Sequence, residues 1–139
     1  MAYWECYYHI VWATKQRTAL IDAQIEPLIY AKLREKSLYC EAPVLGIGGI
    51  ENHIHVAVCI PPKMAVAEWV RNVKGYITRE VNGLFPDREQ LFHWQSSYGV
   101  LTFGQKQTEY VLNYIDRQKQ HHAENHLQAR LERTDQQDA

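Results

Sequence analysis

Apolar residues recur along the chain with two different periods, which predicts strands and helices in succession. Four stretches are rich in β-branched and aromatic residues, and three longer stretches carry apolar residues every three or four positions. The expected strands cover residues 3–13, 43–50, 52–60 and 98–103, and the expected helices cover residues 22–39, 65–83 and 105–122. The resulting order, β-α-β-β-α-β-α, is that of the ferredoxin-like split βαβ arrangement with one added C-terminal helix.

This order predicts an α+β fold in which two helices cover one face of an antiparallel sheet. The other face is left to bind a ligand or to be covered by the added helix. Three glycines, Gly46, Gly48 and Gly49, lie in the second predicted strand. Glycines inside a strand indicate a bulge or a place where another group approaches the backbone closely.

Length and composition favour a single domain with a substantial core. The chain has 139 residues, of which 46% are hydrophobic, and we expect one domain over residues 1–125. The polar stretch 126–139 is expected to be a frayed or disordered tail. A net charge of −1 argues against a histone-like binder of polyanions, so any polyanion would meet a local patch.

The remaining composition excludes several classes of protein. Three widely spaced cysteines without a Cys-x-x-Cys pair give neither a disulfide framework nor a zinc knuckle. No segment approaches the roughly 20 apolar residues that span a bilayer. The first residues also lack the pattern of a signal peptide. We therefore expect a cytoplasmic protein without a membrane partner.

Two histidines in the third predicted strand are the first candidate for chemistry. His53 and His55 are two positions apart, so their side chains share one face of the sheet. Two adjacent imidazoles form half of a metal site. The alternative is a pair of histidines on the solvent face of an edge strand, but the topology places this strand in the centre of the sheet.

The last predicted helix carries the second candidate. Tyr114 and Gln118 are four residues apart and therefore one turn apart on the same helical face, which Tyr110 also shares. The simpler interpretation is an amphipathic helix with a half-buried tyrosine and a solvated glutamine.

Taken together, these motifs resemble those of the single-tyrosine HUH transposases of bacterial insertion sequences, the insertion-sequence-200-like family, and of their relatives, the REP-associated tyrosine transposases. The similarity runs over nearly the whole chain. It rests on four ordered stretches: YHIVWATK at residues 8–15, NHIH at residues 52–55, FHWQSSYG at residues 92–99 and YIDRQ at residues 114–118, the last followed by two histidines.

The resemblance implies a metal-dependent cut-and-join reaction. The motif histidines His53 and His55, with Gln118, would hold Mg²⁺ or Mn²⁺, and Mn²⁺ suits nitrogen ligands better. Tyr114 would be the nucleophile, attacking single-stranded DNA to form a 5′-phosphotyrosine and a free 3′-OH. Tyr110 is the alternative nucleophile, and we prefer Tyr114 because its spacing to Gln118 matches the family. The sequence indicates no general base for the phenol.

The resemblance also implies partners. Relatives bind hairpins at element ends and cut single-stranded DNA nearby, often as homodimers in which the tyrosine helix acts in trans; REP-associated relatives can be monomeric. Candidate phosphate contacts are basic side chains: Lys15, Arg17, Arg71, Lys74, Arg79 and Arg117. His121 and His122 are interpreted as surface residues or DNA contacts, and His9 and His93 as structural or solvent-facing.

A second function of a different class remains open. The chain could be a non-catalytic, domesticated or decayed protein of the same fold that binds nucleic-acid hairpins. An RNA-binding sheet of the RRM type is disfavoured, because no aromatic RNP-like run lies on a central strand.

Overall fold

Four strands form one antiparallel sheet in the order β2-β3-β1-β4. The computed structural model describes residues 2–124 and 127–135. The strands are β1 Tyr7–Ala13, β2 Val44–Ile50, β3 His53–Cys59 and β4 Gly99–Phe103. This order and the alternation of strands and helices confirm the predicted split βαβ arrangement. β1 begins at Tyr7, four residues later than the sequence pattern indicated.

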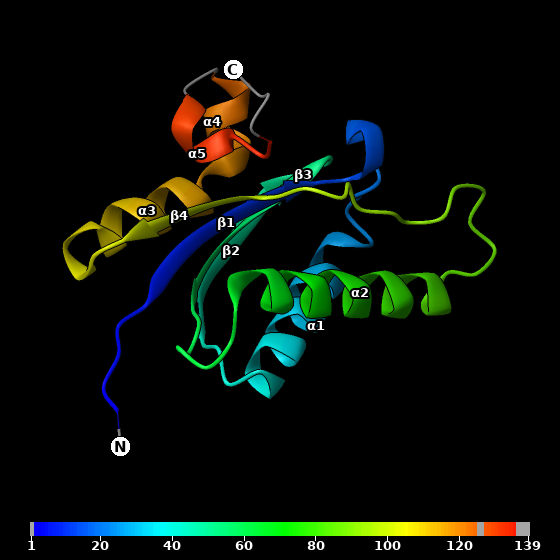
Figure 1. Cartoon of the computed structure of the whole chain (residues 1–139). Helices are drawn as coiled ribbons and strands as arrows, with labels where there is room; N and C mark the ends of the chain where they lie inside the picture. The colour runs from blue at the N-terminus through cyan, green and yellow to red at the C-terminus, as the bar shows by residue number, and fades with distance from the viewer. Residues whose placement is uncertain (1, 125–126, 136–139) are drawn as a thin grey trace.

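The helices lie on both faces of the sheet (Figure 1). Helices α1 Glu26–Tyr39 and α2 Val66–Leu84 cover one face, and α3 Thr108–Asp116, α4 Gln118–Ala123 and α5 Ala129–Glu132 lie over the other. Two short 3-10 helices, η1 Lys15–Arg17 and η2 Gln105–Gln107, precede α1 and α3. No helix among residues 2–124 and 127–135 has the length and apolar character needed to cross a membrane.

The main core lies between the sheet and the α1–α2 layer. Alternate side chains of β1 and β3, among them Ile10, Trp12, Ile54 and Val56, are completely buried there. Burial of a large apolar side chain contributes about 1.5–3 kcal/mol. Because alternation in a strand is strict, the intervening residues of β1 and β3 point to the other face, where α3, α4 and α5 lie.

Ser37 connects the two core helices to the loop before β2. Its hydroxyl donates to the carbonyl of Ala42 at 2.5 Å and accepts from the indole N–H of Trp69 at 3.0 Å, and both side chains are buried. We expect Ser37→Ala to lower the free energy of unfolding by about 1–3 kcal/mol, because it leaves a buried donor and acceptor unpaired. Urea unfolding measures the change, and Ser96→Ala, at an exposed position, is the matched control.

Close packing of α3 on β2 explains two of the strand's glycines. A Cβ atom on Gly48 would lie 2.0 Å from the carbonyl oxygen of Ile115, and one on Gly46 would lie 2.9 Å from Leu112 Cδ2. The register of β2 on β3 also shifts between Val44 and Gly46. Both expectations raised by the glycines, a bulge and a close approach, are therefore met.

The C-terminal region differs from the expected single helix. The helix breaks at Arg117, whose φ of −103° and ψ of 25° end α3, and α4 begins at Gln118. Lys119 then anchors α4 through the carbonyl of Gly49 at 3.0 Å and the carboxylate of Glu26 at 2.7 Å. The tail expected over 126–139 falls partly on residues 126 and 136–139, which lie outside the described residues; residues 127–135 instead contain α5 and pack on the sheet.

Candidate active site

The two strand histidines point to the sheet face that α3, α4 and α5 cover. His53 and His55 are 3% and 0% exposed. Each has one ring nitrogen fixed from behind: His53 Nδ1 lies 2.8 Å from Asn52 Oδ1, and His55 Nδ1 lies 2.8 Å from His9 Nε2. In both rings this leaves Nε2 directed into the space under the C-terminal helices. The pair is therefore buried on a central strand rather than solvated on an edge.

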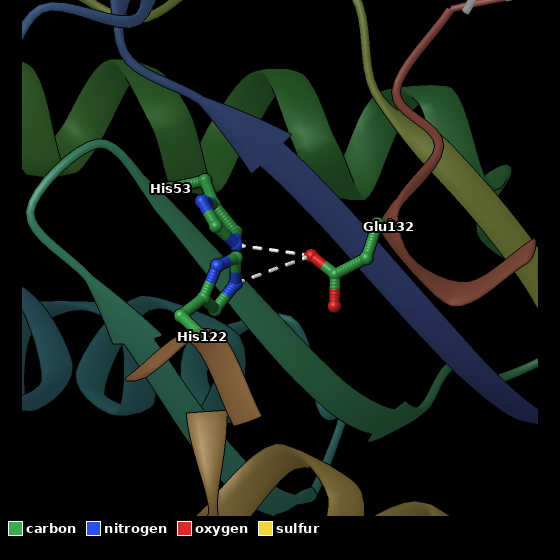
Figure 2. Close-up of side chains that lie close together, drawn as sticks. All are labelled: His53, His122 and Glu132. Atoms are coloured by element: carbon green, nitrogen blue, oxygen red, sulfur yellow. Dashed lines mark ion pairs between the residues drawn. The ribbon is translucent and has the colours of Figure 1, made fainter. Parts of the chain in front are cut away.

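A carboxylate faces both imidazoles. Glu132 of α5 places its Oε1 atom 3.1 Å from His53 Nε2 and 3.2 Å from His55 Nε2. His122 of α4 adds a third imidazole, whose Nε2 lies 3.6 Å from the same oxygen. Figure 2 shows His53 and His122 converging on Glu132, which reaches them from the opposite side. Segments from three parts of the chain thus meet at one oxygen atom.

Tyr114 lies beside this cluster. Its ring centroid is 5.9 Å from that of His55, and its hydroxyl donates a short hydrogen bond to Glu132 Oε2. The hydroxyl also accepts the backbone N–H of Gln128 at 3.0 Å, and His121 stacks on the ring at 4.7 Å. Tyr110, the alternative nucleophile, is 57% exposed, whereas Tyr114 is 4% exposed.

Gln118 is buried but is directed elsewhere. Its amide nitrogen donates to the carbonyl of Tyr114 at 3.3 Å, and its Oε1 lies 3.1 Å from His122 Nε2. Gln118, the predicted third ligand, therefore contacts His122 of the cluster. Burial places all of these groups in a region where unpaired polar atoms are costly.

The electrostatics of the cluster favour a positive ion. Burial lowers the pKa of His55 and of His122. Burial acts to raise the pKa of Glu132, but its close contacts with the imidazoles of His53 and His55 outweigh burial, so the pKa of this carboxyl is well below its usual range. A carboxylate is thus held beside His55 and His122, whose pKa values are lowered. Burial, more than the neighbouring carboxylate, also raises the pKa of the Tyr114 phenol.

His53 provides a direct test of whether the residues fit a metal ion. Its Nε2 is buried and has no hydrogen-bond partner, although a carboxylate oxygen lies 3.1 Å away. Candidate donor atoms of His53, His122 and Glu132 all lie within 4.8 Å of one another. Imidazole nitrogen and carboxylate oxygen together suit Mn²⁺ and similar divalent ions. The donor set therefore fits a divalent cation.

The buried support of His55 predicts a pH dependence of stability. Burial, and secondly His55, lowers the pKa of His9 from 6.5 to about 3. The unfolded chain binds a proton at His9 below about pH 6.5 and the folded chain does not, so stability falls as the pH is lowered through this range. In EDTA, His9→Gln should reduce the slope of unfolding free energy between pH 6.5 and 4.5 by up to about 1.4 kcal/mol per pH unit. His93→Gln, at an exposed position, should leave the slope unchanged.

The profile of the family described as "Transposase IS200 like" matches residues 2–118. The chain belongs to this family. It is therefore a transposase, an enzyme that cleaves and transfers DNA.

Relatives and solved structures agree with this assignment. The ISDra2 transposase TnpA of Deinococcus radiodurans is 24% identical over 115 residues, which cover 80% of this chain and 82% of the relative. The IS200 transposase of Salmonella typhimurium is 29% identical over 119 residues, covering 83% and 78%. The chain also shares its fold with a crystal structure of a D. radiodurans transposase, with a TM-score of 0.69 and 22% identity over 84% of this chain and 93% of the other.

A second solved structure is a REP-associated tyrosine transposase bound to a REP hairpin. It superposes with a TM-score of 0.63 and 11% identity, covering 84% of this chain and 68% of the neighbour. At this identity the likeness concerns the fold, and it confirms the ferredoxin-like arrangement.

The predicted phosphate contacts of the transposase fall into two groups. Lys15 and Arg17 are exposed on η1, and Arg117 is exposed at the break between α3 and α4. Arg71 and Arg79 are exposed on α2, in the layer opposite the histidine pair.

Lys74, also on α2, is used within the fold. Its ammonium donates to the carbonyls of Gln95 and Ser97 at 2.9 Å each, and burial lowers its pKa to about 8. Lys74 thus does not extend toward solvent as we expected.

Three residues of the cluster were not identified from the sequence. His122 was interpreted as a surface residue, although it lies four residues beyond Gln118 and so shares its face. His9 was expected to be structural or solvent-facing and proves to support His55. Glu132 lies in the stretch expected to be a frayed tail, where a lone carboxylate gives no spacing signal.

Proposed function

We propose that this transposase cleaves and rejoins single-stranded DNA at hairpin-marked element ends through a 5′-phosphotyrosine on Tyr114. The observation that carries the proposal is that the Tyr114 hydroxyl and the Nε2 atoms of His53 and His55 all contact the carboxylate of Glu132. A nucleophile and a cation-binding group must lie this close to act on one phosphate.

The chain's own residues supply the positioning for this reaction. His53 and His55 would hold Mg²⁺ or Mn²⁺. The family resemblance implies Gln118 as the third ligand, but here both of its amide atoms are engaged by Tyr114 and His122. When bound, the ion supplies Lewis-acid polarisation of the scissile phosphate. Asn52 and His9 fix the orientation of the two imidazoles from behind.

Tyr114 performs the bond exchange. Its phenolic oxygen forms a bond to phosphorus, the phosphorus–O3′ bond breaks, and the released strand ends in a 3′-OH. The phenol is protonated at neutral pH, and burial raises its pKa further above the ordinary value for tyrosine. The Glu132 carboxylate accepts the phenol's hydrogen bond and so orients the hydroxyl. The phenol's proton passes to water as the bond to phosphorus forms, and the leaving O3′ oxygen takes a proton from water. A later attack by another 3′-OH on the phosphotyrosine rejoins the strands.

The proposed partner is DNA that contains a hairpin and an unpaired flank. The REP-associated neighbour of the same fold is bound to a REP hairpin. Exposed Lys15, Arg17 and Arg117 are candidate contacts for the phosphate backbone. A groove of about 860 Å³ reaches the histidine cluster at Glu132, and its lining also includes Arg17.

The expected homodimer with a tyrosine helix acting in trans stays a prediction. In this chain Tyr114 lies beside the histidines of the same chain, an arrangement that supports cleavage within one subunit. Sedimentation of the protein with and without DNA measures the number of subunits.

The test is incubation of the protein with labelled single-stranded DNA that carries a hairpin and a flank, in the presence of Mn²⁺. We expect a covalent protein–DNA adduct that survives denaturation, together with a new 3′-OH end, and both should disappear in EDTA. Tight hairpin binding without adduct under any metal condition would favour the alternative, a non-catalytic hairpin-binding protein.

A further inference from the structure

The stretch 127–135, here called the C-terminal segment, lies beyond the residues that the family profile matches, and yet it enters the histidine cluster. We propose that this segment completes the cation site: Glu132, together with His122 of α4, ligates the ion beside His53 and His55. The inference rests on one part of the proposed function, namely that His53 and His55 bind a cation.

The spacing of the donor atoms is that of ligands around one ion. Donors bound to a common cation at about 2.0–2.2 Å lie roughly 3–3.5 Å apart. Glu132 Oε1 lies 3.1 Å from His53 Nε2, 3.2 Å from His55 Nε2 and 3.6 Å from His122 Nε2. The oxygen is thus at ligand spacing from the two imidazole nitrogens of β3 and slightly farther from the imidazole nitrogen of α4.

The contacts of His53 also favour an ion between its ring and the carboxylate. Asn52 Oδ1 can only accept, so a proton on His53 Nδ1 satisfies this contact, and the ring directs Nε2 toward Glu132. That Nε2 is buried and makes no hydrogen bond. A cation between Nε2 and the carboxylate oxygen 3.1 Å away would give both buried atoms a partner.

The C-terminal segment is held in place by contacts outside the cluster. The carbonyl of Arg133 packs so closely on β4 that a Cβ atom on Gly99 would lie 1.8 Å from its oxygen. Thr134 is 1% exposed and accepts from Arg17 at 3.4 Å. The N–H of Gln128 binds the Tyr114 hydroxyl at 3.0 Å. These contacts fix the approach of Glu132 to the histidines.

Gln118 has a supporting role in this arrangement. Its two amide atoms are engaged by Tyr114 and His122, so it orients His122 rather than facing the ion itself. Glu132 uses its second oxygen to hold the Tyr114 hydroxyl. One carboxylate therefore connects the cation site to the nucleophile and positions both.

Mn²⁺ binding to the full chain, measured by titration calorimetry without DNA, tests this proposal. We expect Glu132→Gln to weaken binding by on the order of 10- to 100-fold, and His53→Ala to abolish it. Glu124→Gln removes the same charge from the exposed end of α4 and should bind Mn²⁺ as the unmodified protein does. Tyr114→Phe should also retain binding, which separates the cation site from the chemistry.

Trypsin cleavage after Arg130 reports whether the C-terminal segment is docked. Mn²⁺ at ten times its Kd should slow this cleavage by roughly tenfold in the unmodified protein, and Glu132→Gln should lose that protection. If Glu132→Gln undocks the segment without metal, His122→Gln on α4 provides the test, with the same expected weakening. Unchanged Mn²⁺ affinity in a docked Glu132→Gln, or in His122→Gln, would overturn the proposal while leaving the histidine pair and the proposed function intact. Failure of the unmodified protein to bind Mn²⁺ would overturn both.

Discussion

Replacing Tyr114 with Phe should abolish covalent attachment to DNA and lower strand cleavage by at least about a thousandfold, because the attacking oxygen is removed. The substitution keeps the ring that packs against His55 and stacks with His121. It removes only the hydrogen bonds with Glu132 and Gln128. Gel analysis of denatured reaction mixtures containing labelled DNA and Mn²⁺ measures both adduct and cleaved strand.

Tyr110→Phe is the matched control for this substitution. Tyr110 lies one turn earlier on α3 and is 57% exposed, so we expect adduct formation at the level of the unmodified protein. Hairpin binding should be unchanged in both variants, since neither alters a charge. Loss of the adduct in Tyr110→Phe together with its persistence in Tyr114→Phe would exchange the roles of the two tyrosines.

The second large effect is expected at a residue that performs no chemistry. Gly48→Ala would place a Cβ atom 2.0 Å from the carbonyl oxygen of Ile115, the residue after Tyr114. Because backbone cannot rotate aside as a side chain can, α3 must move away from β2. We expect a loss of about 1–3 kcal/mol in the free energy of unfolding and a fall in cleavage of about a hundredfold from misplacement of Tyr114.

Gly46→Ala tests whether this effect depends on α3 backbone. Its Cβ would meet only the end of the flexible Leu112 side chain, at 2.9 Å. We therefore expect Gly46→Ala to keep most of its activity and stability. Equal losses of stability and activity in the two variants would show that β2 tolerates no added side-chain atom. The contact between Gly48 and Ile115 would then have no special role.

The sequence was sufficient for the fold and for the face on which the histidines lie. Period-two and helical patterns depend on burial alone, and burial of Ile54 and Val56 in the main core forces His53 and His55 to the other face. The glycines of β2 likewise indicated a close approach, and α3 makes it. These are local patterns that any packed sheet must obey.

The completion of the site could not be predicted in the same way. Glu132 reaches His55 across 77 positions in the sequence, so the contact depends on how the C-terminal segment crosses β4 at Gly99. The break at Arg117 turns α4 and brings His122 to His53, with ring centroids 4.8 Å apart. The sequence has no proline or glycine between residues 108 and 123 to mark this break.

The central claim is that Tyr114 forms the covalent link to DNA. Trypsin releases it in the peptide 107–117, QTEYVLNYIDR, which also contains Tyr110. Fragmentation mass spectrometry of the DNA-linked peptide, after nuclease digestion, identifies the modified tyrosine. The account predicts a 5′-phosphodeoxynucleotide on Tyr114 and an unmodified Tyr110. A nucleotide on Tyr110, or on any residue outside this peptide, would contradict it.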